Sequence, residues 1–117
     1  MHNVFVYGTL RTIASGGKLP EANYMLSGFQ MYDYGKFPYI VPDPDAAVYG
    51  NMLVVNDEDL AQLDKYENVS GGLYTREEVD VQPMAVIGDV PTVKAFVYVA
   101  TSELLPKMVT SGEWFRR

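Results

Sequence analysis

The sequence contains no cysteine and a single histidine, His2. The lack of cysteine excludes disulfides, a thiolate nucleophile and a thiolate zinc site. Because His2 stands beside a chain end, we expect it to be disordered rather than catalytic, which leaves a Ser-His-Asp triad without a base. A transition-metal site would then need several clustered carboxylates, and none cluster convincingly in the sequence. We therefore predict no metal site.

Basic residues are also few. Nine Lys and Arg face fifteen Asp and Glu, giving a net charge of −6 and a pI of about 4.6. An acidic surface repels phosphate backbones, so we expect no nucleic-acid partner. No apolar run approaches the roughly 20 residues that span a bilayer, and Met1-His2-Asn3 does not begin a secretory signal. We expect a cytoplasmic protein without a membrane partner, and a reducing cytoplasm is compatible with the lack of cysteine.

What the chain does contain is typical of one globular domain. A length of 117 residues, 48% of them hydrophobic, is enough to bury a core, and we find neither a repeat nor a dividing linker. We therefore predict a single domain over 1–117, with a monomer as the default at this size. Nine tyrosines are numerous for this length. They suit strands, and they can line a pocket with apolar rings and polar tips.

The N-terminal stretch Val4-Phe5-Val6 predicts a buried strand that runs into Tyr7-Gly8-Thr9-Leu10. Gly8 permits a turn or a close approach of a ligand, because it has no Cβ. Successive free N–H groups in such a turn form a concavity that binds anions. This stretch therefore predicts a small site for a carboxylate or an oxyanion, and the alternative is a strand followed by an ordinary turn.

Several other segments combine branched and aromatic residues with bounding turn signals, which predicts strands at 23–26, 29–32, 37–41, 47–55, 74–81 and 93–99. Gly28 and Gly50 indicate bulges, turns or close backbone contacts. We expect a rigid connection at 42–45 and a short helix at 104–109. Many strands and one convincing helix indicate an α+β fold, and the glycine-marked bends are what a sheet needs to curl into a small barrel.

The convincing helix is predicted over 56–67. Asn56 is a good N-cap, and acidic residues follow it in the first turn. Glu67 comes seven residues after Leu60 and four after Leu63, so helical spacing places its carboxylate on the same, core-facing side. Asp64 is expected to point elsewhere, into solvent.

An inward Glu67 at a helix end is a candidate for acid/base chemistry. Burial and the negative end of the helix both disfavour the carboxylate, so both should raise the pKa of Glu67. A carboxyl group near neutrality can accept a proton and return it. The structural alternatives are that Glu67 pairs with Arg76 or Arg11, or that it reaches water at a fraying helix end.

Two motifs, Phe5-Val6-Tyr7-Gly8-Thr9-Leu10 and Leu63-Asp64-Lys65-Tyr66-Glu67, together resemble the γ-glutamylcyclotransferase-like family. The resemblance is closest to its γ-glutamylamine cyclotransferase and AIG2-like branch, and it extends through 37–39, 48–50, 73–76 and 112–114. It thus covers nearly the whole chain. It implies a small mixed β-barrel with flanking short helices.

The resemblance also implies a site and a reaction. Tyr7, Gly8, Thr9 and Leu10 would hold a substrate α-carboxylate through backbone amides, and Glu67 would act as general acid/base. Thr9 replaces a commoner serine, and Asn68 stands where the family usually has glycine. The implied reaction converts a γ-glutamyl amide into 5-oxoproline and a free amine or amino acid without a cofactor. The identity of the leaving amine stays open.

Two other functions remain open from the sequence. The same pocket could bind a small acidic metabolite without turnover, or the domain could serve as an interaction module, because fold alone does not imply activity. The chain could instead be a related amide hydrolase, or a maturation enzyme that removes a γ-glutamyl group.

Overall fold

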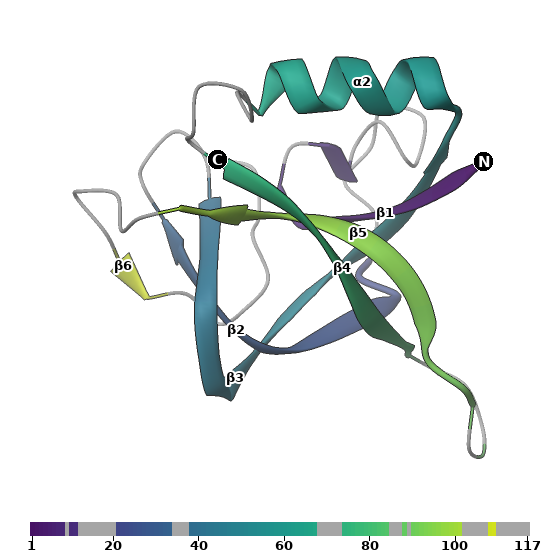
Figure 1. Ribbon diagram of the computed structural model, residues 1–117. Coiled ribbons are helices and arrows are strands. Elements are labelled where there is room, and N and C mark those ends of the chain that lie inside the picture. Colours follow the sequence, from purple (N-terminus) through teal and green to yellow (C-terminus); the bar gives the residue numbers. More distant parts are fainter. Residues whose placement is uncertain are drawn as a thin grey trace.

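Strands make up most of the residues that the structure describes (Figure 1). The computed structural model describes residues 1–8, 10–11, 21–33, 38–67, 74–84, 88, 90–101 and 108–109. The elements in chain order are β1 (His2–Val6), β2 (Tyr24–Asp33), β3 (Pro38–Val55), α2 (Asp57–Tyr66), β4 (Tyr74–Pro83), β5 (Val93–Ala100) and β6 (Met108–Val109).

The strands pair in the order β3-β1-β5-β4-β2-β6, and β3 also pairs with β2. Strand β1 runs parallel to β5 and antiparallel to the last part of β3. The first part of β3 pairs antiparallel with β2, and β4 pairs antiparallel with β5. The result is a mixed sheet with α2 lying across one side (Figure 1). The predicted combination of many strands with one convincing helix is thus confirmed, while the closure of the sheet into a barrel with flanking helices stays a prediction.

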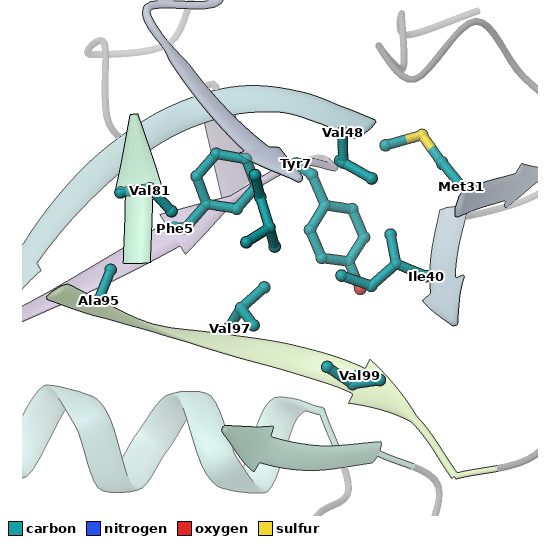
Figure 2. Close-up of a cluster of buried hydrophobic side chains, with 10 residues drawn as sticks. Phe5, Tyr7, Met31, Ile40, Val48, Val81, Ala95, Val97 and Val99 are labelled. Carbon is teal, nitrogen blue, oxygen red and sulfur yellow. The ribbon is translucent and has the colours of Figure 1, made fainter. Parts of the chain in front are cut away.

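Strands β1 and β5 are buried on both faces, which explains their nearly continuous apolar sequences. Side chains alternate between two clusters along each strand. Phe5 of β1 and Tyr7, which directly follows this strand, join Val97 of β5 in the cluster shown in Figure 2. Val4 of β1 and Tyr98 of β5 join the second cluster, to which α2 contributes Leu60. Helix α2 therefore covers the face of the sheet that carries this second cluster.

Helix α2 forms as its sequence predicts. The Asn56 side chain accepts a hydrogen bond from the Asp59 N–H at 2.8 Å, which caps the first turn. Leu60 is buried against the sheet. The last turn closes when the N–H of Glu67 donates to the Leu63 carbonyl at 2.9 Å. Glu67 is therefore the C-terminal cap, and its backbone is fixed by the helix.

Two glycines have the structural roles that their positions indicated. A Cβ at Gly50 would lie 2.2 Å from the Val6 carbonyl oxygen, so β3 can approach β1 here only without a side chain. Gly28 has a φ of +90°, and the register of β2 against β3 shifts between Ser27 and Phe29. Gly28 thus forms the predicted irregularity in β2.

Three local predictions are wrong. Residues 42–45 are not a separate connection, because β3 continues through them and Pro42 lies opposite Phe29 of β2. Met108 and Val109 form the short strand β6 against β2 rather than the end of a helix, while 102–107 lie outside the described residues. His2 is ordered in β1, where its ring pairs with Asp57 of α2.

Candidate active site

A cavity of about 290 Å³ lies where β1 ends. Its walls come from β1, the corner that follows it, the start of β3, the last turn of α2, the start of β4, and β5. The lining residues are Phe5, Val6, Tyr7, Gly8, Leu10, Pro38, Tyr66, Glu67, Tyr74 and Tyr98. Three of the four residues predicted to bind the carboxylate therefore share one cavity with Glu67, and the fourth, Thr9, lies outside the described residues.

The corner after β1 is a tight turn that Arg11 stabilises through its backbone and its side chain. The Arg11 N–H donates to the Gly8 carbonyl at 3.0 Å, which closes the turn. A Cβ at Gly8 would lie 3.1 Å from Pro38 Cγ, so glycine allows the corner to pack against β3. The Arg11 side chain is fully buried, and its Nε donates to Asn51 Oδ1 at 2.8 Å. This bond ties the corner to the last part of β3, which also pairs with β1.

Glu67 presents its carboxyl group to the cavity from the end of α2. Burial raises its pKa to about 7. The negative end of the helix acts in the same direction. Within the described part of the chain, no cationic side chain forms an ion pair with Glu67. Its charge is therefore countered neither by Arg76 nor by Arg11, contrary to one of the alternatives considered from the sequence.

Arg76 pairs instead with Asp64, at 3.0 Å between Nη1 and Oδ2. The other carboxylate oxygen of Asp64 accepts a hydrogen bond from the Tyr98 hydroxyl at 2.7 Å. The expectation that Asp64 points freely into solvent is therefore wrong. Asp64 follows Leu60 by four residues, so the same helical spacing that turns Glu67 inward also turns Asp64 toward the sheet.

Tyrosines form much of the remaining wall. Burial raises the pKa of Tyr7, Tyr74 and Tyr98, and the nearby Glu67 carboxylate adds to each shift. All three are therefore neutral hydroxyls at physiological pH. The Tyr7 hydroxyl donates to the Tyr98 carbonyl at 2.7 Å. Tyr66 is 67% exposed beside Glu67 and lies at the open side of the cavity.

This arrangement combines a carboxyl group that can exchange a proton near neutral pH with a glycine-containing backbone corner. Among the described residues, no group of three or more His, Cys, Asp or Glu side chains could hold a metal ion. In the same part of the chain, no helix has the length and apolar character needed to cross a membrane.

The sequence did not indicate the roles of Tyr98, Tyr74 and Pro38 in the cavity wall. Tyr98 and Tyr74 belong to strands that the sequence predicted, but which cavity they line depends on pairing between distant segments. Asp64 was detectable in principle, because it lies four residues after the buried Leu60. Its partners Arg76 and Tyr98 come from β4 and β5, and no local pattern connects them to α2.

Comparison with known proteins identifies the family. Residues 4–116 match the family model described as "Gamma-glutamyl cyclotransferase, AIG2-like". A Vibrio cholerae protein provisionally named as a gamma-glutamylcyclotransferase is 30% identical over 123 aligned positions, covering 99% of this chain and 97% of that protein.

Solved structures agree on the fold. The Escherichia coli protein ytfP has a TM-score of 0.65 at 24% identity, over 96% of this chain and 95% of that one. A structure titled "Gamma-glutamyl cyclotransferase" has a TM-score of 0.64 at 18% identity, over 92% of this chain and 69% of that one. On this evidence the chain belongs to the gamma-glutamyl cyclotransferase, AIG2-like family and is an enzyme of the cyclotransferase type.

Proposed function

We propose that this enzyme cyclises a γ-glutamyl amide to 5-oxoproline and releases a free amine or amino acid, with Glu67 as general acid/base. The observation that carries the proposal is the position of Glu67. Its carboxyl group, with a pKa raised to about 7 by burial, lines the same cavity as the Tyr7–Gly8–Leu10 corner. A group that is half protonated near neutral pH can serve as both base and acid within one cycle.

The proposed reaction is intramolecular. Backbone amides of the corner, including the Thr9 position, hold the substrate α-carboxylate. The Glu67 carboxylate removes a proton from the α-ammonium group, and the freed nitrogen attacks the γ-carbonyl carbon. The new C–N bond closes a five-membered lactam while the original amide C–N bond breaks. Glu67 then returns its proton to the departing nitrogen. The second proton that the ring nitrogen carries after the attack passes through Glu67 to the same departing nitrogen, so the products are the neutral lactam and an ammonium ion and the enzyme ends in its starting state.

The cavity supports this reaction in two ways. Its volume of about 290 Å³ is at the small end of the range for ligand sites, about 300–1,000 Å³, which suits a folded glutamyl group. The rings of Tyr74 and Tyr98 and the side chain of Leu10 give it apolar walls. Holding the amine against the carbonyl supplies a high effective molarity, and apolar walls disfavour attack by water. Cyclisation is therefore favoured over hydrolysis.

The test is incubation of the purified protein with a panel of γ-glutamyl compounds, including glutathione, γ-glutamyl-lysine and γ-glutamyl amino acids, with 5-oxoproline measured by mass spectrometry. We expect 5-oxoproline and the matching amine from at least one compound. Glu67→Gln should keep the fold and lower kcat by about 10²–10⁴-fold, the usual contribution of a general acid/base. The matched control is Glu58→Gln, the same change at an exposed position in the first turn of α2.

Each alternative has its own outcome. Glutamate in place of 5-oxoproline would indicate an amide hydrolase. Binding of a γ-glutamyl compound without turnover would indicate a metabolite-binding module. A folded Glu67→Gln variant with full lactam production would remove Glu67 from the mechanism.

A further inference from the structure

We propose that Tyr98 and Asp64 are positioning residues that set the distance between the two sides of the active site. The proposal rests on the function proposed above, and it concerns how the corner and Glu67 are held relative to one another. Neither residue is assigned a direct role on the substrate. The argument depends on two hydrogen bonds that meet at Tyr98.

The first bond holds the corner side. The Tyr7 hydroxyl donates to the main-chain carbonyl of Tyr98 at 2.7 Å, in a buried environment. Tyr7 immediately precedes Gly8, so this bond fixes the last side chain before the corner against β5. Because the acceptor belongs to the strand backbone, it cannot move without moving β5.

The second bond holds the Glu67 side. The Tyr98 hydroxyl donates to Asp64 Oδ1 at 2.7 Å. Asp64 lies one helical turn before Glu67, so this bond fixes the end of α2 over β5. The remaining Asp64 oxygen pairs with Arg76 of β4, whose guanidinium lies 4.9 Å from the centre of the Phe96 ring. Asp64 is therefore held from two strands at once.

Tyr98 thus connects both sides of the cavity: its backbone holds Tyr7 and its side chain holds α2. Without this bond, the last turn of α2 would keep the Asp64–Arg76 pair and the packing of Leu60 and Leu63, but it would lose its direct hydrogen bond to β5. Glu67 would then shift or take up water. Because misplacement of a catalytic group by about 1 Å can cost about 10²-fold in rate, loss of the Tyr98–Asp64 bond should lower kcat.

The test is a double-mutant cycle with Tyr98→Phe, Asp64→Ala and the double variant, measured as kcat and KM for 5-oxoproline release. We expect each single change to lower kcat by about tenfold or more and to change KM much less. The double variant should lose no more than Asp64→Ala alone, because Asp64→Ala already breaks the Tyr98–Asp64 bond, together with the pair to Arg76. Asp64→Asn retains an acceptor for the Tyr98 hydroxyl and should recover most of kcat. Tyr49→Phe removes a hydroxyl on β3 outside the cavity lining and is the matched control.

A second readout does not depend on turnover. Carbon-13 NMR of labelled glutamate, assigned by comparison with Glu67→Gln, gives the pKa of the Glu67 carboxyl group. Among the residues that the structure describes, the titratable groups that interact with Glu67 are Tyr7, directly after β1, Tyr74 of β4 and Tyr98 of β5. Tyr98→Phe changes no charge at neutral pH, so a lower Glu67 pKa in this variant reports rehydration of the carboxyl group. Tyr49→Phe should leave the pKa unchanged.

The outcomes separate the two proposals. Full activity in Glu67→Gln would end the proposed function, and the NMR measurement would still decide whether Tyr98 positions Glu67. Losses in kcat that multiply in the double variant would show that the Tyr98 hydroxyl acts by another route, such as contact with substrate. An unchanged kcat and an unchanged Glu67 pKa in a folded Tyr98→Phe variant would overturn the positioning role.

Discussion

At the C-terminal end of α2, the carboxylates of Asp64 and Glu67 lie one turn apart, and their contacts with the sheet differ. Asp64 receives a hydrogen bond from Tyr98 and an ion pair from Arg76. Glu67 receives neither within the described residues and instead lines a cavity, where burial raises its pKa to about 7. A carboxyl group that points from the helix toward the sheet is therefore not reactive for that reason alone. Its pKa depends on whether it lies against a cation and a hydrogen-bond donor, as Asp64 does, or lines a cavity, as Glu67 does.

The largest expected effect is a difference in activity between two similar changes. Glu67→Gln and Asp64→Asn each remove one negative charge from the last two turns of α2. We expect Glu67→Gln to lower kcat by about 10²–10⁴-fold and Asp64→Asn to lower it by less than about tenfold. Steady-state assays of 5-oxoproline release on both folded variants measure the difference. Similar losses of kcat in the two variants would mean that the different surroundings of Asp64 and Glu67 do not give them different roles in the reaction.

The second prediction concerns pH. Glu67 must be ionised to accept a proton, and its pKa is about 7. We expect kcat/KM to fall about tenfold for each unit below that value. A profile measured from about pH 4 to pH 9 tests this in the wild-type enzyme. A limb centred near the ordinary pKa of a glutamate, about 4.3, would show that the folded enzyme does not hold Glu67 as described.

The third prediction is that the reactive carboxyl group lowers stability. The pKa of Glu67 is raised on folding, from 4.5 to about 7. Between these values the native state binds more protons than the unfolded state, so the free energy of unfolding falls as pH rises. At about 1.36 kcal/mol per pKa unit, the loss reaches up to about 3 kcal/mol above pH 7.

Glu67→Gln removes this cost because the amide has no charge. We expect the variant to be more stable than the wild type by about 1–3 kcal/mol at pH 8, with the difference vanishing near pH 4. Chemical denaturation at the two pH values measures it. Asp64→Asn should show no such gain, because it breaks the pair with Arg76. A Glu67→Gln variant no more stable than the wild type at pH 8 would contradict a buried, uncompensated carboxylate.

The smallest expected effect is the change in stability when the ion pair between Arg76 and Asp64 is broken. Arg76→Met keeps most of the aliphatic length but removes the charge that faces Asp64. The side chains of Arg76 and Asp64 are 30% and 29% exposed to solvent. We therefore expect a loss of only about 0.5–1 kcal/mol in the free energy of unfolding, and the loss should shrink in high salt. A loss that did not depend on salt would indicate that the Phe96 contact, rather than the charge, supplies the stability.

The family motifs and the local residue patterns were enough to predict most of the strands and the helix. Branched and aromatic residues predicted β1, β4 and β5, and Asn56 with its acidic first turn predicted the start of α2. These features depend on neighbours in the sequence, so a sequence reveals them. The inward side of Glu67 follows from the same kind of reasoning, since helical spacing relates it to Leu60. The functional roles of Glu67 and the corner residues stay predictions.

The partners of α2 could not be read in this way. Asp64 and Tyr98 are 34 residues apart, and only the pairing of β4 with β5 brings Arg76 and Tyr98 beneath the same helix turn. Similarly, the sequence marked 42–45 as a connection because of its prolines and aspartates. In the structure Pro42 pairs with Phe29 of β2, and β3 continues through the next residues to Ala47, which pairs with Ser27.

The amino-acid sequence by itself determined where the strands and the helix form and which side of α2 faces inward, because these depend on residues a few positions apart. Only the tertiary structure decided that Arg76 pairs with Asp64 and that Glu67 lines a cavity. The physical reason is that a carboxyl group's pKa depends on the charges, donors and water within a few ångströms. For Glu67 those neighbours come from β1, β4 and β5, which are distant in sequence and close only in the folded chain.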